Sequence, residues 1–285
     1  MIDAYLKENI NEKNEKVYRH YAKLTTLDGN ETEYITDKDC SAHRGKLVSV
    51  SFHSGKAVLS PVNTAATVSG RFDWSKKTLG KSVLASDIKI LDIAVYENYR
   101  DGKYARIFPQ RIDSLEIRQD NILYVEKNPK GEISGLVLKN ATNDMYAFGM
   151  VVKVSNKSGG MLLMGEYDLL VGGEQKHINT SSVIYNVYSG QPALFDFEET
   201  ELKGIKPLTE LSERIKSIDD YFIYTSSAKY ALSDKVVVYK KTSETENKYE
   251  VISLREAIAG KDKMTAYYDN PTQSGGKIRV LVIDL

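Results

Sequence analysis

The chain has 285 residues, with 39 basic and 39 acidic side chains and a formal net charge of zero. This balance argues against a bulk electrostatic attraction to nucleic acid or to anionic membranes. Apolar residues make up 41% of the chain, enough for a sizeable core, and the single cysteine, Cys40, excludes an intrachain disulfide and a multi-cysteine metal site.

The first sixteen residues are polar, and within them Ile2, Leu6 and Ile10 recur every four residues. This spacing is helical, so the sequence predicts a short amphipathic helix or a linker over residues 1–16. The segment lacks the apolar core of a signal peptide. No run of about 18 apolar residues occurs in the sequence, so we expect no membrane-spanning helix. An exported protein would contain this chain as one part of a longer whole.

After Lys16 the pattern changes to short runs of alternating apolar residues, which is typical of β-strands. Val48, Val50 and Phe52 share one face of such a run, and turn signals rich in glycine and asparagine separate the runs. The clearest predicted strands cover residues 46–52, 121–128, 135–140, 264–270 and 277–285.

Helical patterns are scarce in the rest of the chain. Ser253 and Glu256 have the spacing of a capping box, which predicts a short helix over residues 253–258. Residues 207–215 are expected to add a further turn or two of helix. Many short strands with few helices predict an all-β fold, built as a tandem duplicated unit of small β-barrel or sandwich subdomains.

The spacing between similar phrases indicates an internal repeat. Ser86 and Ser233, each followed by an aspartate, lie 147 residues apart, and the phrases YARI and YEVI lie 145 residues apart. Seven such matches occur in the same order along the chain, with offsets between 142 and 147 residues. The sequence therefore predicts a first β-rich unit at residues 17–145 and a second at 146–285 that repeats it.

The two Ser-Asp phrases could belong to a catalytic set, but no histidine or other base recurs beside them. Serine and aspartate side chains commonly satisfy backbone N–H groups where a strand begins after a turn. We therefore interpret Asp87 and Asp234 as architectural residues at the entry to a repeated strand.

The residues most often used in catalysis form no recognisable set. Cys40 has His43 three residues later, but the second unit offers Ile184 or Tyr185 near the matching position, so a core or loop cysteine is favoured over an activated thiolate. The histidines have no His or Cys neighbours at ligand spacing and are interpreted as surface residues. They are His20, His43, His53 and His177.

Two weaker signals concern calcium and sugars. The acidic stretch at residues 196–201 lacks the residue order of an EF-hand loop, so a solvated loop is favoured over a calcium site. Exposed tyrosines can stack on sugar rings, whereas tyrosines in strands more often pack against neighbouring strands. Seven tyrosines fall in predicted strands, namely Tyr124, Tyr185, Tyr188, Tyr224, Tyr239, Tyr267 and Tyr268. We predict no catalytic, cofactor-binding or metal-binding residue and do not expect an enzyme.

The second half of the chain resembles a known kind of protein. Its phrases YALSDKVVVYKK, VISL, TAYYDN and GGKIRVLVID are similar to the β-rich repeats of Gram-positive (Firmicutes) cell-surface proteins that carry S-layer homology domains. The resemblance is strong over residues 208–285 and weaker over residues 66–140.

The resemblance implies a non-catalytic structural or interaction module without a cofactor, located outside the cell and associated with the cell wall or S-layer. Its partners would be other surface-protein domains, copies of itself or cell-wall polysaccharide, with no nucleic acid and no membrane span. The alternative is a carbohydrate-binding module of a wall-associated or polysaccharide-degrading protein.

Overall fold

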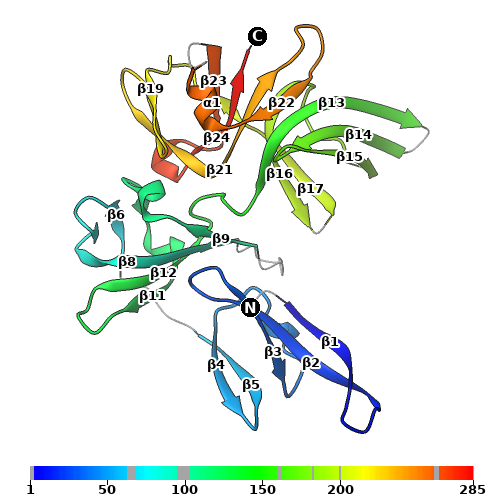
Figure 1. Ribbon diagram of the computed structural model, residues 1–285, viewed down its shortest axis with the longest axis vertical. Coiled ribbons are helices and arrows are strands. Elements are labelled where there is room, and N and C mark those ends of the chain that lie inside the picture. The colour runs from blue at the N-terminus through cyan, green and yellow to red at the C-terminus, as the bar shows by residue number, and fades with distance from the viewer. Residues whose placement is uncertain are drawn as a thin grey trace. The chain divides into compact units, whose positions relative to one another are not determined.

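The structure is a computed structural model, and it describes residues 3–62, 68–94, 103–159, 162–181, 183–198, 200–259 and 263–284 (Figure 1). Most of these residues lie in strands of four sheets, and α1 (Leu254–Ala259) is the one α-helix in the described ranges. The predicted all-β fold is confirmed. Within the same ranges no helix is long and apolar enough to cross a membrane.

The chain forms two compact units. The first contains Met1–Pro109 and Glu116–Ala141, and the second contains Gln110–Leu115 and Thr142–Leu285. The division near residue 141 is close to the predicted repeat boundary, but the short segment Gln110–Leu115 of the first repeat belongs to the second compact unit. Sequence repeat and compact unit are therefore not the same piece of chain.

The first unit begins with a five-stranded sheet in the order β1-β2-β3-β5-β4. The predicted helix or linker at residues 1–16 is wrong, because Asp3–Ile10 pairs antiparallel with β2 along its whole length. A spacing of four residues fits one helical face, but it is also a multiple of two and fits one strand face equally well. The strands are β1 (Asp3–Ile10), β2 (Lys16–Thr25), β3 (Glu31–Thr36), β4 (Val48–His53) and β5 (Lys56–Pro61).

The second sheet of the first unit has seven strands in the order β10-β6-β7-β8-β12-β11, and β9 pairs separately with β8. Its centre is the parallel pair of β8 and β12, in which four consecutive residues of β12, Leu136 among them, are buried. The strands are β6 (Gly70–Asp73), β7 (Thr78–Leu79), β8 (Ser82–Ile93), β9 (Tyr104–Ile107), β10 (Glu116–Ile117), β11 (Ile122–Lys127) and β12 (Ile133–Lys139).

The second unit begins with a five-stranded antiparallel sheet in the order β15-β14-β13-β16-β17. Its core holds Val151, Tyr167 and Phe195, each fully buried. The strands are β13 (Ala147–Gly159), β14 (Leu162–Val171), β15 (Glu174–Ser181), β16 (Gln191–Glu198) and β17 (Glu201–Pro207).

The last sheet has the order β18-β23-β24-β21-β20-β19, and β22 pairs separately with β21. The helix predicted at residues 207–215 is wrong. Thr209 and Glu210 form a strand against β23, and the Leu211 N–H donates to Ala266 O at 2.8 Å. The strands are β18 (Thr209–Glu210), β19 (Ser217–Ile218), β20 (Phe222–Tyr224), β21 (Lys229–Lys241), β22 (Tyr249–Ile252), β23 (Met264–Tyr268) and β24 (Ile278–Ile283).

The helix predicted at residues 253–258 is present as α1, together with its capping box. The Glu256 N–H donates to Ser253 Oγ at 3.2 Å, and the Ser253 N–H donates to Glu256 Oε2 at 2.8 Å. Both bonds use backbone donors that lack an intrahelical partner at a helix start. Ala257 is buried on the packed face, whereas Ile258 is exposed.

The two seven-stranded sheets share a central arrangement and an irregularity. In each, a long strand lies parallel to the closing strand and antiparallel to a four-residue strand. Each long strand contains a bulge. An advance of five residues in β8, from Leu84 to Lys89, pairs with an advance of only two residues in β12, and the same five-to-two mismatch occurs in β21 from Leu232 to Val237 against β24. The edge strands β10 and β18 cannot be compared between the copies. At an offset of 145 residues, β10 matches residues 261–262 and β18 matches residues 64–65, and both ranges fall outside the described residues.

The shared bulge corrects the predicted role of the Ser-Asp phrases. Both phrases lie inside their strands and not at a strand entry. Leu232 lies 148 residues after Leu84, so the strands align one residue away from the offset that pairs Ser86 with Ser233. A shift by one residue places a strand side chain on the opposite face. Ser233 is accordingly buried, whereas Ser86 is exposed.

The two five-stranded sheets are less alike. In the first sheet, β5 joins the three-stranded meander β1–β3 at its last strand, β3, through the single pair Thr36 and Ala57. In the second sheet, β16 joins the meander β13–β15 at its first strand, β13. The internal repeat therefore stays a prediction for these regions, and the support for it comes from the seven-stranded sheets.

Candidate functional site

Four charged side chains are buried together in the second unit. Asp144 lies in the turn before β13, Asp269 follows β23, Lys277 directly precedes β24, and Arg279 is the second residue of that strand. In the same order, their exposed fractions are 3%, 6%, 2% and 0%. Two carboxylates face two cations, so the formal charges balance. We name these four residues the ionic cluster.

The position of Arg279 explains why the cluster must be paired. All six residues of β24 are buried, because β21 and β23 flank the strand and apolar side chains surround it. A charge in such a strand is tolerated only with direct partners. Asp269 is held in place for this role, because its Oδ1 accepts the backbone N–H groups of Asn270 and Lys277 at 2.9 Å each.

Arg279 connects the two carboxylates. Its Nη1 donates to Asp144 Oδ1 and, at 2.9 Å, to Ser233 Oγ, while its Nε donates to Asp269 Oδ2 at 2.9 Å. The Asn143 amide adds a bond to Asp269 Oδ2 at 3.0 Å. The guanidinium is therefore fixed from several sides, in the geometry that suits its fork of donors.

Lys277 has a simpler environment, in which Nζ lies 2.5 Å from Asp144 Oδ2. Burial lowers the pKa of Lys277, and the nearby charge of Asp144 opposes this shift. Burial by itself would raise the pKa of Asp144, but Arg279 and then Lys277 hold that pKa at about 2. At neutral pH Asp144 is therefore ionised, and its carboxylate lies between Arg279 and Lys277.

A further ion pair lies beside the cluster at the β21 bulge. Arg111, in the segment Gln110–Leu115 of the second unit, places Nε 2.6 Å from Asp234 Oδ1 and donates from Nη1 to Leu232 O at 2.7 Å. Burial raises the pKa of Asp234, while Arg111 and Lys277 oppose the rise. The carboxyl of Asp234 is thus within electrostatic range of Lys277.

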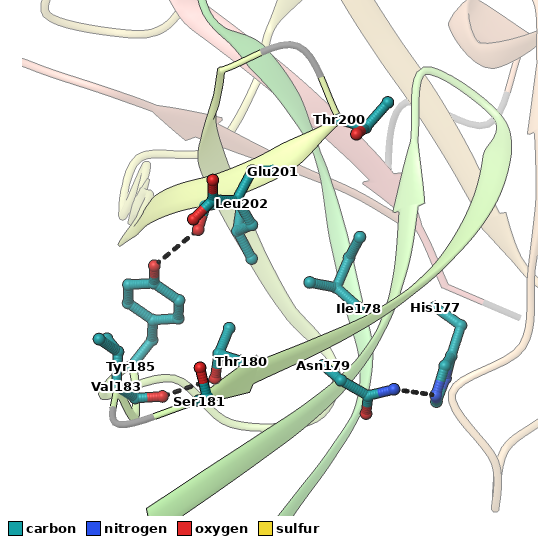
Figure 2. A pocket seen from close by; sticks show the side chains of 10 residues that line it. All are labelled: His177, Ile178, Asn179, Thr180, Ser181, Val183, Tyr185, Thr200, Glu201 and Leu202. Atoms are coloured by element: carbon teal, nitrogen blue, oxygen red, sulfur yellow. Dashed lines mark hydrogen bonds between the residues drawn. The ribbon is translucent and has the colours of Figure 1, made fainter.

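The second candidate is a polar pocket of about 250 Å³ in the sheet β13–β17 (Figure 2). Side chains of β15 and the connection after it line one side, and Thr200, Glu201 and Leu202 line the other. The Tyr185 hydroxyl donates to Leu202 O at 3.1 Å across this space. Strands β15 and β17 are the two edges of their sheet, so the pocket lies where its edges approach each other.

His177 stands at one end of the pocket, beside Asn179 (Figure 2), and both of its ring nitrogens have neighbours. Nδ1 lies 2.7 Å from Asp168 Oδ1, and Nε2 lies 3.4 Å from Asn179 Nδ2. The Thr180 hydroxyl of the same strand donates to Val183 O at 2.6 Å. Among the described residues, no hydrogen bond from His177 to a hydroxyl or thiol is present, which a base that activates a nucleophile would need.

The remaining predicted candidates are dispersed. Cys40 is 4% exposed and packs with Ala22 and Leu24 in an apolar cluster, so it is a core cysteine. Among the described residues, no group of three or more His, Cys, Asp or Glu side chains is placed to hold a metal ion. The histidines lie on separate elements, with His20 on β2, His43 in a 3₁₀ turn, His53 on β4 and His177 on β15.

The acidic stretch at residues 196–201 covers the end of β16 and the start of β17. Lys203 lies 3.1 Å from Glu198 and 2.7 Å from Glu201, so a local cation partly neutralises the stretch. Glu199 lies outside the described residues.

The seven candidate tyrosines do not form an exposed platform. Among them only Tyr188 is exposed, while Tyr239 is fully buried and donates to Leu170 O at 3.0 Å. The prediction that all seven lie in strands is wrong for Tyr185 and Tyr188, which lie in the connection between β15 and β16. Polar residues and Gly190 in that connection favour a loop over a strand.

Comparison with known proteins gives no match, whether against protein-family models, curated proteins or solved structures. What the chain can do chemically therefore rests on the arrangement of its own residues. The ionic cluster was not predicted, although one signal was present in the sequence. Lys277 and Arg279 interrupt the start of an otherwise apolar strand, and the matching positions of the first repeat, 145 residues earlier, hold Glu132 and Ser134.

Proposed function

We propose that the chain is a non-catalytic structural or interaction module of a bacterial cell-surface or S-layer-associated protein. One observation carries the proposal: a seven-stranded sheet with the same central strand arrangement and the same bulge occurs twice in one chain. Tandem copies of one β-unit are the usual means of extending a protein along one direction. Spacing or displaying other domains is the role that suits such copies.

The character of the buried polar groups supports this role. In the ionic cluster each carboxylate faces a cation, and within the described part of the pocket His177 contacts Asn179 and the acidic side chains of β14. In both arrangements the charged groups are paired with one another, as expected for groups that stabilise a fold. The proposed partners are other surface-protein domains or further copies of the chain, in an extracellular setting at the cell wall or S-layer.

Carbohydrate binding is the alternative proposal, and the tyrosines do not favour it. A stacking platform needs exposed aromatic faces side by side. Here Tyr188 is exposed, but Tyr239 and Tyr267 are buried or half-buried among the sheets. A pull-down with purified wall polysaccharides tests this alternative, with Tyr188→Ala as the variant and Tyr18→Ala, an exposed tyrosine of the first sheet, as the matched control.

The surface role is tested with antibodies raised against the purified chain. We expect them to label intact cells of the source organism and to detect the protein in isolated cell envelopes. Labelling that appears only after the cells are made permeable would overturn the proposal. Specific, saturable binding to a wall polysaccharide that is lost in Tyr188→Ala would instead favour the carbohydrate-binding alternative.

A further inference from the structure

We propose that Lys277 and Asp144 join to form an intramolecular amide bond within the second unit. The bond would link Nζ of the lysine to Cγ of the aspartate. The inference depends on the geometry of the ionic cluster and does not require the surface location proposed above.

The first argument is proximity inside a dry environment. Lys277 Nζ lies 2.5 Å from Asp144 Oδ2, and the two side chains are 1% and 4% exposed. An amine and a carboxyl held in contact by a folded core have a very high effective concentration. Exclusion of water also removes the competing reaction, which is hydrolysis of the product.

The second argument concerns the carbonyl that would be attacked. Arg279 Nη1 donates to Asp144 Oδ1, and Asp269 and Ser233 fix the guanidinium that carries this donor. A fixed cationic donor at one carboxyl oxygen stabilises the negative charge that develops there as nitrogen adds to carbon. The other oxygen, Oδ2, faces Lys277 and is the one placed to leave. Asp144 thus has distinct positions for the oxyanion and for the leaving oxygen.

The third argument concerns the protons. The lysine ammonium must lose a proton before it can attack, and burial already lowers the pKa of Lys277. Asp144 Oδ2 accepts a hydrogen bond from Lys277 Nζ at 2.5 Å, so the oxygen that leaves is also the one placed to take this proton. Arg279 also favours the charged carboxylate of Asp144, which is a poor electrophile, so we expect the reaction to be slow after folding.

The reaction balances without an oxidant, a reductant or a co-reactant. The lysine ammonium and the aspartate carboxylate give one amide and one water. The bond between Nζ and Cγ forms, the bond between Cγ and Oδ2 breaks, and the departing oxygen takes two of the three ammonium protons. One positive and one negative charge disappear together, so Arg279 and Asp269 remain as a balanced pair.

A comparison within the chain argues that the fold alone does not require these residues. The closing strand of the first repeat, β12, has the same place in its sheet as β24. At the positions of Lys277 and Arg279, 145 residues earlier, the first repeat carries Glu132 and Ser134. A sheet of this topology therefore forms without a buried lysine at this point, and the pair is an addition of the second unit.

The location of the bond suits a module that bears load. Asp144 is at the beginning of the second unit, and Lys277 lies just before its last strand, 133 residues later. A covalent bond between them would carry a force applied to the ends of the unit, and the strands between them would not be pulled apart.

Intact-mass measurement of the purified full-length chain tests the proposal. We expect a mass lower than that of the sequence by one water molecule, about 18 Da, and a single branched peptide containing Asp144 and Lys277 after digestion. The Lys277→Arg chain keeps the positive charge but cannot form this amide, so it should show the full sequence mass. The matched control is Lys240→Arg, which changes an exposed lysine of β21 and should keep the mass loss.

The result that would overturn the proposal is a folded wild-type chain with the full sequence mass and an unmodified Lys277 peptide. Folding is checked by a cooperative thermal transition in the same sample, so this outcome does not depend on any variant folding. Amine labelling after denaturation gives a second readout, because a linked Lys277 would stay unlabelled. Cell-surface labelling is a separate measurement, so the two proposals can fail independently.

Discussion

Ser233 Oγ accepts a hydrogen bond from Arg279 Nη1 at 2.9 Å, and both residues are almost completely buried. The serine also accepts the N–H of Lys235 at 3.1 Å, so it supports the β21 bulge and the ionic cluster together. In the sequence Ser233 matches Ser86 of the first repeat, but in the structure Ser233 is buried in the ionic cluster whereas Ser86 is exposed. A substitution at Ser233 therefore probes the cluster without removing a charge.

Ser233→Ala should lower the free energy of unfolding by about 1–3 kcal/mol, because a buried donor of Arg279 loses its acceptor. Ser86→Ala is the matched control, since Ser86 opens the same phrase in the first repeat but is exposed. Urea unfolding of both variants measures the difference. Equal stabilities for the two variants would contradict the structural role of Ser233.

Arg279→Met should be far more damaging, because it leaves the buried Asp269 carboxylate without its cation and leaves Asp144 with Lys277 alone. Removing one partner of a buried ionic network costs about 3–5 kcal/mol. Arg255→Met, on the exposed face of α1, removes the same charge at the surface and should unfold close to wild type. Thermal unfolding followed by circular dichroism distinguishes them, and a minor shift for Arg279→Met would show that the cluster is not coupled to the fold.

Part of this fold could be predicted from the sequence, because strands and turns depend on local patterns. The alternation in the runs at 121–128 and 264–270, and the capping box of Ser253 and Glu256, both correspond to elements that are present. The N-terminal helix failed because a spacing of four residues does not distinguish a helix from a strand. Only the pairing partner, β2, decides between them.

The candidate site could not be predicted, since it depends on contacts between distant parts of the chain. Lys277 and Arg279 stand out at the start of an apolar strand, but their partner Asp144 is 133 residues before Lys277 and nothing in the sequence connects them. Predicting that Ser233 is buried also requires the register of β21 in its sheet. The sequence offset matches Ser233 with the exposed Ser86, whereas the strand pairing matches Ser233 with the buried Ala85.

The pH dependence of stability should reveal Asp144. Its folded pKa is about 2, below the usual value of 3.8, so ionised Asp144 stabilises the fold above about pH 4. This contribution, on the order of 2 kcal/mol, should be lost as the pH falls from about 4 towards 2. The Lys277→Arg chain is the background for this measurement, because Asp144 stays free to titrate in it.

The comparison is made with the same chain carrying Asp144→Asn as well. Both proteins contain the other carboxyls, including Asp234, whose raised pKa acts in the opposite direction. The difference between their unfolding free energies therefore isolates Asp144. A difference that stays constant over the acid range from about pH 5 to about pH 2 would contradict the depressed pKa.

Gly149 in β13 should not tolerate a side chain. An added Cβ would lie 1.9 Å from Leu170 O and 3.0 Å from the Tyr239 hydroxyl, and the first of these neighbours is backbone. Gly149→Ala should therefore destabilise the second unit by more than about 2 kcal/mol. Gly204→Ala in β17 is the control, because its Cβ would meet only Asp196 Cβ, at 3.6 Å. Comparable melting temperatures for both variants would contradict the tight contact of β13 with β14.

Arg111 tests whether the segment Gln110–Leu115 is part of the second unit. The side chain is 13% exposed, and it pairs with Asp234 at 2.6 Å and with Leu232 O at 2.7 Å. Arg111→Ala leaves the Asp234 carboxyl without its paired cation, so its pKa should rise further. The loss of stability should grow as the pH rises from the folded pKa of Asp234 in the wild type to its higher value in the variant, and should level off above both.

A double-mutant cycle of Arg111→Ala with Asp234→Ala gives the coupling directly. Because the two side chains are in contact and largely shielded from water, we expect a coupling energy of about 0.5–3 kcal/mol. Arg118→Ala provides the control, since Arg118 follows the same segment but is exposed and should show no coupling to Asp234. If Arg111 and Asp234 prove additive in urea unfolding, then the segment does not stabilise the second unit through this ion pair.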